Sequence, residues 1–351
     1  MRILLTGAAG FIGAHVASEL RAAKHEVIEI DALLPSAHPA GTAPDGLQRI
    51  DVRDSDGLDD ILTGVDVVCH QAAVVGSGIG PDDAPAYASH NDFGTAVLLA
   101  AMHRAGCERL VLASSMVVYG EGRYRCDTCG IVDPLPRTTA DLDAGRFDNR
   151  CPISGDATSW DLVPEEAALR PRSTYAASKV AQEHYASAWA AATGGSVTAL
   201  RYHNVYGDLM PSDTPYSGVA AMFRSSLAAG RAPAVFEDGA QTRDFVHVQD
   251  VAVANRLAIE AALGGFEALN VCSGQPITIG AVADILAKTA AGPAPVVTGQ
   301  YRPGDVRHVV ADPARAYARL GFRATTRPAD GLAAFADAPL RARAAESSPS
   351  V

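Results

Sequence analysis

The sequence predicts an α/β protein with a doubly wound parallel sheet and a smaller α/β part beside it. Over residues 1–112 a short apolar run, a turn and an amphipathic helix follow one another repeatedly, which is typical of parallel strands joined by helical crossovers. A glycine-rich turn also follows the first apolar run directly. At 351 residues, the chain is long enough for two parts that each bury a core.

The elements follow from this periodicity. Apolar runs bounded by turn residues predict strands at 3–6, 26–30, 65–70, 109–113 and 197–201. Helical spacing predicts helices at 12–23, 58–62, 91–105, 174–193 and 249–263.

The domain organisation is predicted from where the periodicity changes. Residues 1–208 and 241–262 form the nucleotide-binding part, and residues 209–240 and 263–340 form the substrate-binding part. Between 120 and 172 the periodicity fails, which predicts an insertion that is either a lid or a small sub-structure of its own. Residues 341–351 are small and polar and are expected to be a flexible tail.

Composition excludes several classes of protein. With 48% hydrophobic residues the chain is a globular protein, and its net charge of -11 would repel nucleic acid and anionic membranes. Met1–Leu5 form an apolar run that enters a glycine turn, unlike a secretory signal, and no apolar stretch is long enough to span a membrane. We therefore expect a cytoplasmic protein with neither nucleic acid nor membrane as partner.

Three glycines mark a dinucleotide site. Gly7, Gly10 and Gly13 follow a predicted strand and open a predicted helix. Gly7 permits the tight turn, Gly10 lets the backbone approach a pyrophosphate, and Gly13 allows the helix to pack closely on the strand. This arrangement predicts a Rossmann-type fold.

Asp31 stands at the end of the second predicted strand. A carboxylate there accepts hydrogen bonds from the ribose hydroxyls and repels a 2′-phosphate, so NAD is preferred over NADP.

Tyr175 and Lys179 lie four residues apart, one turn along a predicted helix. A lysine cation and a positively charged nicotinamide ring would favour the phenolate, which then takes a proton from a hydroxyl group. These two side chains are therefore candidate catalytic residues.

The order of these motifs, with Leu112–Gly120 between them, resembles the extended short-chain dehydrogenase/reductase family as far as about Phe322. The resemblance is to its NAD-dependent nucleotide-sugar epimerases and dehydratases of the UDP-glucose 4-epimerase type. It implies that Ser115 is the catalytic hydroxyl beside Tyr175 and Lys179. It also implies cofactor contacts from Phe11, Ile12, Asp51, Val52, Gln71, Ala72, Ala73, Ser114, Tyr175, Lys179 and Tyr202.

The same resemblance implies a nucleoside diphosphate-sugar substrate, linked to UDP or dTDP. Asn204 would contact the diphosphate, and Arg243 and Arg302 would clamp it because a guanidinium fork binds oxyanions well. Asp305 is a candidate for a ribose hydroxyl, and Ser115 and Met116 would contact the sugar.

The residues after Ser115 bear on the reaction. The family's 4,6-dehydratases carry an aspartate and a glutamate there, whereas this chain has Met116 and Val117, which cannot exchange protons. Epimerisation, at C4 through a transient ketone, is therefore the main hypothesis. A ketoreductase, dehydrogenase or dehydratase is the alternative. An NAD-binding regulator without turnover is a remote alternative, because such a protein would be free to lose Tyr175 or Lys179 and this chain has both.

His203 stands where the family commonly has an apolar aromatic residue. It is interpreted as a histidine satisfied by the backbone, and contact with a sugar substituent is the alternative.

Cys126, Cys129 and Cys151 gather within the insertion. Cys126 and Cys129 have the spacing of a metal knuckle, and Cys151 begins a second one whose last position is Ser154. Structural zinc takes four cysteine or histidine ligands, so zinc stays open but is not favoured over an ordinary packed loop. A disulfide is disfavoured in a reducing cytosol.

Two further resemblances concern subgroup and assembly. Tyr119–Cys126 and Met210–Tyr216 look like dTDP-L-rhamnose 4-epimerase-like enzymes. Family members often form homodimers through a four-helix contact, which the helices at 91–105 and 174–193 would supply here.

Overall fold

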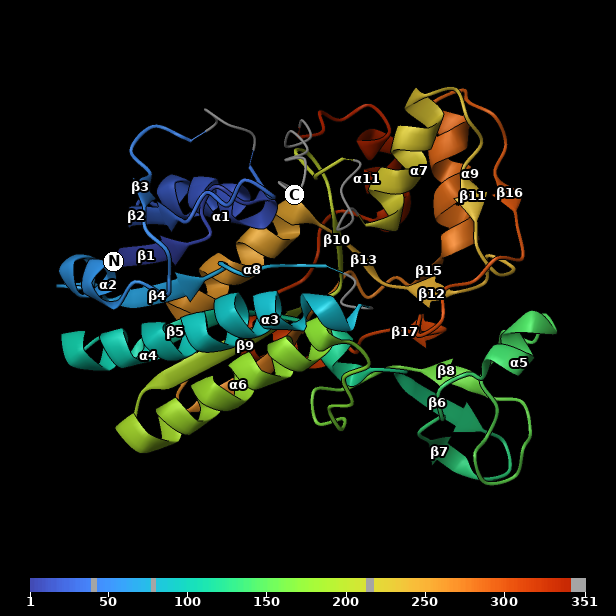
Figure 1. The fold of residues 1–351 in the computed structure, drawn as a ribbon, viewed down its shortest axis with the longest axis horizontal. Helices are drawn as coiled ribbons and strands as arrows, with labels where there is room; N and C mark the ends of the chain where they lie inside the picture. Colours follow the sequence, from blue (N-terminus) through green and yellow to red (C-terminus); the bar gives the residue numbers. More distant parts are fainter. Residues whose placement is uncertain (39–42, 77–79, 213–217, 342–351) are drawn as a thin grey trace.

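The computed structural model describes residues 1–38, 43–76, 80–212 and 218–341. Its centre is a seven-stranded sheet of order β14-β9-β5-β4-β1-β2-β3, in which every neighbouring pair is parallel (Figure 1). The strands are β1 Arg2–Thr6, β2 Glu26–Asp31, β3 Gln48–Arg49, β4 Val67–His70, β5 Arg109–Ser115, β9 Ser196–Tyr202 and β14 Phe266–Val271.

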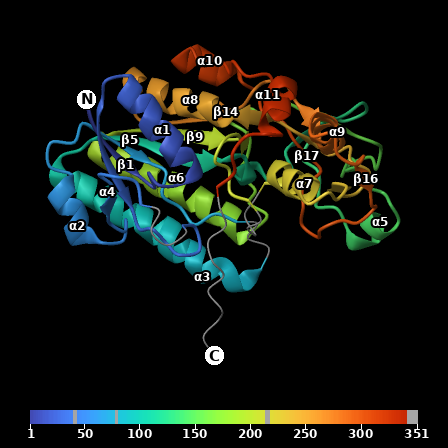
Figure 2. The same cartoon turned by 90° about the horizontal axis from the view of Figure 1, so that it is seen from above.

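Helices cover both faces of this sheet because successive strand residues point to opposite sides. Ile3 and Leu5 belong to one buried core and Leu4 to another. The first core includes residues of α1 (Phe11–Ala22), α8 (Val248–Ala261) and α10 (Ala314–Leu320). The second includes residues of α2 (Ser55–Ile61), α4 (Gly94–Ala105) and α6 (Thr174–Thr193), so the predicted doubly wound sheet is confirmed (Figure 2).

The strand order reverses at β1, which lies between β2 and β4. The chain winds outward from β1 in one direction through β2 and β3 and in the other through β4 and β5. A crevice therefore opens at the carboxyl ends of β1 and β4, where sheets of this kind bind their ligands.

The smaller part packs on a third core that includes residues of α7 (Val219–Ala228), α9 (Ile279–Thr289) and α11 (Pro328–Phe335). Its short strands form the pair β11 (Ala234–Val235) and β16 (Val296–Val297), and the sheet β15 (Ile277–Thr278), β12 (Thr242–Arg243) and β17 (His308–Val309). β10 (Asn204–Tyr206) pairs with β13 (Phe245–His247).

The insertion is a small sub-structure of its own. Its antiparallel sheet has the order β7-β6-β8, formed by β6 (Arg123–Cys126), β7 (Gly130–Val132) and β8 (Ser159–Asp161), and α5 (Thr139–Asp143) follows β7 in the chain. Figure 1 shows it projecting from the central sheet below β17. The remaining helical segments are η1 Pro81–Asp83, α3 Ala84–Tyr87, the π-helical η2 Ala88–Phe93 and η3 Met116–Tyr119.

Three segments lie in a different part from the one predicted. β14 was assigned to the substrate-binding part, but it pairs with β9 at the edge of the central sheet. α10 was assigned to the same part, but it packs in the core of the central sheet with α1 and α8. β12 was assigned to the nucleotide-binding part, but it pairs with β15 and β17. These placements depend on contacts across the chain, which hydrophobic periodicity does not specify.

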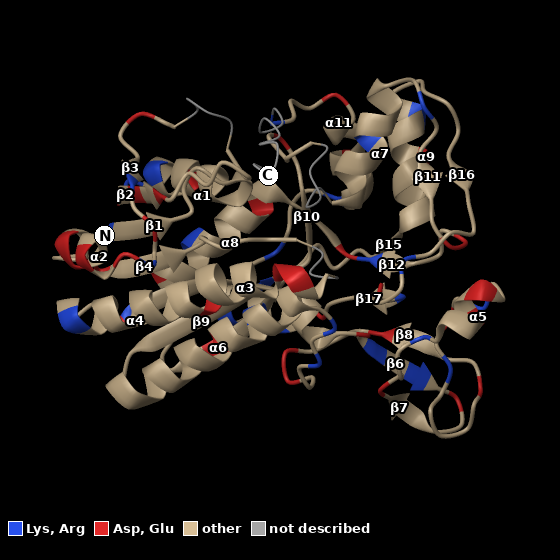
Figure 3. Cartoon of the chain, in the orientation of Figure 1, with Lys and Arg blue, Asp and Glu red and all other residues tan. Residues whose placement is uncertain are grey.

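Charged residues of both signs are interspersed over the elements visible in Figure 3. Binding of a phosphate group therefore depends on local cations and backbone amides. Within the described ranges, no helix combines the length and hydropathy needed to cross a membrane. Of the predicted tail, residues 342–351 lie outside the described residues, as do residues 213–217, which include part of the Met210–Tyr216 stretch.

Candidate active site

A cavity of about 720 Å³ opens at the carboxyl ends of the central strands and extends into the smaller part. Its volume is in the range of ligand pockets. All predicted cofactor, catalytic and substrate residues line it: Gly7, Gly10, Phe11, Ile12, Gly13, Asp31, Asp51, Val52, Gln71, Ala72, Ala73, Ser114, Ser115, Met116, Tyr175, Lys179, Tyr202, Asn204, Arg243, Arg302 and Asp305. The candidate metal ligands Cys126, Cys129 and Cys151 do not.

The glycine turn is packed so closely that side chains do not fit. Gly7 has φ +67°, and a Cβ on it would lie 2.6 Å from the backbone nitrogen of Ala72. A Cβ on Gly13 would lie 2.1 Å from the carbonyl oxygen of Gly7. α1 begins at Phe11, so its free amides and positive dipole end point into the cavity region, which favours a bound pyrophosphate.

Asp31 is the last residue of β2, and it is held in place by the backbone. It accepts hydrogen bonds from the amides of Ala9 at 3.1 Å and Leu33 at 2.8 Å. Burial raises the pKa of Asp31, but His38 at 3.4 Å and the two amides together lower it below its ordinary value. The carboxylate is therefore ionised at neutral pH and would repel a 2′-phosphate.

A hydrogen-bonded group fixes Gln71 beneath the cofactor side of the cavity. The hydroxyl of Tyr202 donates to the Gln71 side-chain oxygen at 3.0 Å. The Gln71 amide nitrogen donates to the Asn255 side-chain oxygen at 3.0 Å. Asn255, on α8, is fully buried and was not predicted, because nothing in its local sequence indicates a contact with β4.

Ser115 and the pair Tyr175 and Lys179 come together at the end of β5. Ser173 caps α6 by accepting a hydrogen bond from the amide of Ala176 at 3.1 Å, which starts the helix just before Tyr175. The side chains of Tyr175 and Ser115 are close enough for the Ser115 hydroxyl to favour the Tyr175 phenolate. The Lys179 ammonium donates to the carbonyl of Ala113 at 3.0 Å and lies 6.0 Å from the centre of the Tyr175 ring.

Burial is the largest influence on the pKa values of Tyr175 and Lys179. It raises the pKa of Tyr175 above its ordinary value, with the Ser115 hydrogen bond opposing it. It lowers the pKa of Lys179 to about 8, opposed by Glu183 and Asp92. The predicted stabilisation of the phenolate requires Lys179 and the nicotinamide ring together, and among the side chains alone burial outweighs the opposing hydrogen bond. A further positive charge beside the ring is needed to favour the phenolate.

The substrate side combines fixed arginines with an unpaired amide. Arg243 donates to the carbonyls of Val306 at 2.6 Å and Arg307 at 2.8 Å, which orients its guanidinium in the cavity wall. The side-chain oxygen of Asn204 is buried and has no hydrogen-bond partner among the described residues. Arg302 lies over the ring of Phe236, with 5.2 Å between guanidinium carbon and ring centre.

Asp305 is an exposed cavity residue that interacts electrostatically with Arg302 and Arg243. Partial desolvation of its carboxyl group raises its pKa, and the two arginines oppose that rise. The carboxyl group is thus placed among cations at the edge of the cavity, where a hydroxyl donor would find an acceptor.

The interpretation of His203 as satisfied by the backbone is wrong. His203 lines the cavity, is 4% exposed, and neither ring nitrogen has a hydrogen-bond partner within the described ranges. Burial lowers its pKa to about 3, opposed by an interaction with the Asn270 side chain, so the ring is neutral. A neutral ring has one donor and one acceptor, and neither makes a hydrogen bond of normal geometry among the described residues.

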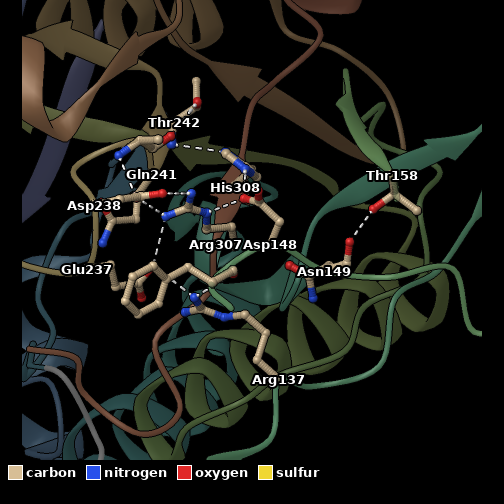
Figure 4. Close-up of polar contacts among 12 residues, drawn as sticks. Arg137, Asp148, Asn149, Thr158, Glu237, Asp238, Gln241, Thr242, Arg307 and His308 are labelled. Carbon is tan, nitrogen blue, oxygen red and sulfur yellow. Dashed lines mark hydrogen bonds and ion pairs between the residues drawn. The ribbon is translucent and has the colours of Figure 1, made fainter. Parts of the chain in front are cut away.

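The cavity wall contains an ion-pair cluster that the sequence did not indicate, in which Arg137, Glu237 and Arg307 are buried (Figure 4). Glu237 lines the cavity and is paired with Arg137 of the insertion and with Arg307, each at 2.9 Å. Arg307 also pairs with Asp238 at 2.6 Å and with Asp148 of the insertion at 2.8 Å. The insertion therefore holds part of the substrate wall in place.

Arg341 was assigned to the flexible tail, but it is hydrogen-bonded to Met210 through its amide and lines the cavity, so it does not belong to that tail. Its guanidinium donates to the carbonyl of Ala9, in the glycine turn, at 2.7 Å. No motif accompanies it, because the contact joins residues 332 positions apart.

Comparison with known proteins decides the family. The model of the "NAD dependent epimerase/dehydratase family" matches residues 3–138 and 152–272. The chain belongs to the NAD dependent epimerase/dehydratase family. The two matched stretches of the family model contain the glycine turn, Ser115, Tyr175, Lys179 and Arg243.

Characterised family members resemble the chain over nearly its whole length. A dTDP-L-rhamnose 4-epimerase of Burkholderia thailandensis is 33% identical over 335 residues, which is 92% of this chain and 90% of the relative. A UDP-glucose 4-epimerase of Mycolicibacterium smegmatis is 30% identical over 342 residues, which is 95% of this chain and 96% of the relative. The solved structure of Thermus thermophilus UDP-glucose 4-epimerase with NAD has a TM-score of 0.76 and 30% sequence identity. The match covers 96% of this chain and 98% of that structure.

Proposed function

We propose that the chain is an NAD-dependent nucleotide-sugar epimerase that inverts C4 of a UDP- or dTDP-linked sugar. The observation that carries the proposal is the meeting of Ser115, Tyr175 and Lys179 with the glycine turn in one cavity, next to Met116 in place of an acid. Two similar proteins support the proposal, a dTDP-L-rhamnose 4-epimerase and a UDP-glucose 4-epimerase solved in complex with NAD.

The residues present fit NAD. The close packing at Gly7 and Gly13 holds the turn against Ala72 and the start of α1, and the turn lines the cavity where a pyrophosphate would bind. The ionised Asp31 lines the same cavity and could accept hydrogen bonds from ribose hydroxyls. Bound NAD supplies a hydride acceptor, and its reduced form supplies the hydride donor.

The side chains then have distinct tasks. Tyr175 takes the proton of the sugar 4-hydroxyl as that carbon is oxidised, and it returns the proton when the ketone is reduced on its other face. Ser115 hydrogen-bonds the same oxygen, and Lys179 holds positive charge near the phenol. Arg243, Arg302 and Asn204 hold the diphosphate while the ketone turns over.

Met116, the residue after Ser115, favours epimerisation over dehydration. Loss of water from a sugar needs a group that protonates the leaving hydroxyl, and a thioether has no proton to give. Met116 lines the cavity at this position. His203, with its two unpaired ring nitrogens, is the group we assign to a sugar substituent.

The test is incubation with a panel that includes UDP-glucose, UDP-glucuronic acid and dTDP-L-rhamnose, followed by separation of the product stereoisomers. We expect conversion of at least one sugar to its C4 epimer without accumulation of NADH. Stoichiometric NADH would indicate a dehydrogenase, and a 4-keto-6-deoxy product would indicate a dehydratase. Either result would overturn the epimerase proposal.

Assembly and location remain predictions. Phe93 is 57% exposed and Tyr185 49% exposed, and they lie just before α4 and on α6, the helices expected to form a homodimer contact. Light scattering of the purified chain at several concentrations tests the dimer, and cell fractionation tests the cytoplasmic location.

A further inference from the structure

The insertion contains two turns of the same design. Cys126 and Cys129 are followed by Gly130 with φ +76°, and Cys151 and Ser154 are followed by Gly155 with φ +78°. In the second turn the amide of Ser154 donates to the Cys151 sulfur at 3.5 Å. Each turn thus presents two side chains three residues apart, with a left-handed glycine that closes the turn behind them.

The two turns face each other. The sulfur atoms of Cys126, Cys129 and Cys151 all lie within 4.8 Å of one another. The Ser154 hydroxyl lies 3.6 Å from the Cys126 sulfur, so a fourth polar side chain stands beside the three thiols. Ligands bound tetrahedrally at about 2.3 Å would be separated by roughly 3.8 Å, so small side-chain movements complete the geometry.

None of these cysteines is in a disulfide, and two of the three are buried, Cys126 at 1% and Cys151 at 3% exposure. Their core consists of only four buried residues, Tyr124, Cys126, Val132 and Cys151. So small a core does not stabilise a separate sub-structure well, and natural proteins of this size commonly add a bound metal or a disulfide.

We propose that Cys126, Cys129 and Cys151 bind one zinc ion as thiolates, with Ser154 or a water molecule that it holds at the fourth position. Three soft sulfur ligands in a tetrahedral arrangement select zinc over the harder divalent cations. Binding releases the thiol protons, and the site is structural because it lies outside the active-site cavity.

The site acts on the cavity through the sheet of the insertion. Tyr124 stands two residues before Cys126 on the same face of β6. The Tyr124 hydroxyl accepts a hydrogen bond from the amide of His308, next to Arg307, at 3.1 Å. A metal at Cys126 therefore fixes the strand that supports Arg307 and, through it, Glu237.

The first measurement is the zinc content of the full chain, purified without chelators and without a polyhistidine tag. We expect a ratio near one zinc per chain, falling to near zero in Cys126→Ser and Cys151→Ser. Cys107→Ser is the matched control, because Cys107 is a buried cysteine outside the insertion, and it should keep the wild-type ratio. A wild-type ratio near zero, even after dialysis against zinc, overturns the proposal, as does zinc that the two variants retain.

If the cysteine variants do not fold, two further measurements test the proposal: the visible spectrum of the cobalt-substituted chain and the same spectrum for Ser154→Cys. After zinc is removed, added Co²⁺ should give the thiolate charge-transfer and tetrahedral visible bands. Ser154→Cys should strengthen the charge-transfer band and slow metal release to a chelator, because a fourth thiolate replaces the hydroxyl. Absence of the charge-transfer band in the wild-type chain, or no change in Ser154→Cys, overturns the assignment. These readouts are independent of epimerase activity.

Discussion

The two sides of the cavity are built in different ways. On the cofactor side, Gly7 follows β1, Asp31 ends β2 and Ser115 ends β5, so the carboxyl ends of parallel strands in one sheet place all three residues along one cavity. On the substrate side, long side chains from distant segments meet, as Arg137 and Glu237 do across 100 positions. Sheet topology determines the first arrangement, whereas the second depends on a buried charge cluster between the insertion and the smaller part.

The largest effect is expected on the cofactor side, from Tyr175→Phe. Loss of the proton-transferring group should lower kcat about 1000-fold. Affinity for NAD and for UDP should stay within a factor of a few, because the ring remains. Kinetics and calorimetric titration measure these quantities, and undiminished turnover would remove Tyr175 from the mechanism.

Arg137→Met tests the substrate side. Glu237 would keep Arg307 but lose one buried partner, so we expect the free energy of unfolding to fall by about 3 kcal/mol and the KM for the sugar nucleotide to rise. Arg125→Met is the matched control in the same insertion: its side chain is 55% exposed and pairs with Asp161. That control should cost less than about 1 kcal/mol. Equal losses in the two variants, measured by denaturant titration, would show that the buried cluster has no special role.

Gly13→Ala tests the close packing of the glycine turn. The added methyl would meet the Gly7 carbonyl, so the turn must shift, with a loss of about 1–3 kcal/mol in stability and weaker NAD binding. Gly264→Ala is the control, because a Cβ there meets nothing within 4 Å. NAD content after gel filtration compares the two. Retention of NAD by Gly13→Ala at the wild-type level would contradict the proposed cradle.

The smallest effect is a pH dependence that arises only on the cofactor side. The pKa of Lys179 is about 8 in the folded chain against an ordinary value of 10.5. Between these values the unfolded chain binds more protons, so the contribution of Lys179 to stability should rise as pH increases from about 8 to 10.5. Thermal unfolding of wild type and Lys179→Met across this range should differ in slope in that direction. Parallel curves would contradict the buried, destabilised ammonium.

The sequence predicted a residue's position correctly where the local backbone, such as a tight turn or a helical turn, determines it. Gly7 and Gly13 are required by the turn, and Tyr175 and Lys179 lie one helical turn apart, so pattern and spacing sufficed to place them in the cavity. It failed where contacts join distant segments. Glu237 and Arg341 carry no local signal, and the placement of β14 is decided by pairing with β9. His203 was misread because burial without a partner is visible only in three dimensions.

The attachment of Glu237 to the insertion has a consequence for how such enzymes diversify. The family model does not match residues 139–151, the stretch that includes Asp148, the partner of Arg307. We expect changes of length or sequence there to move Arg307 and Glu237 in the cavity wall while leaving the glycine turn and Tyr175 untouched. Exchanging this stretch between relatives would test whether substrate choice changes while the reaction at Tyr175 is kept.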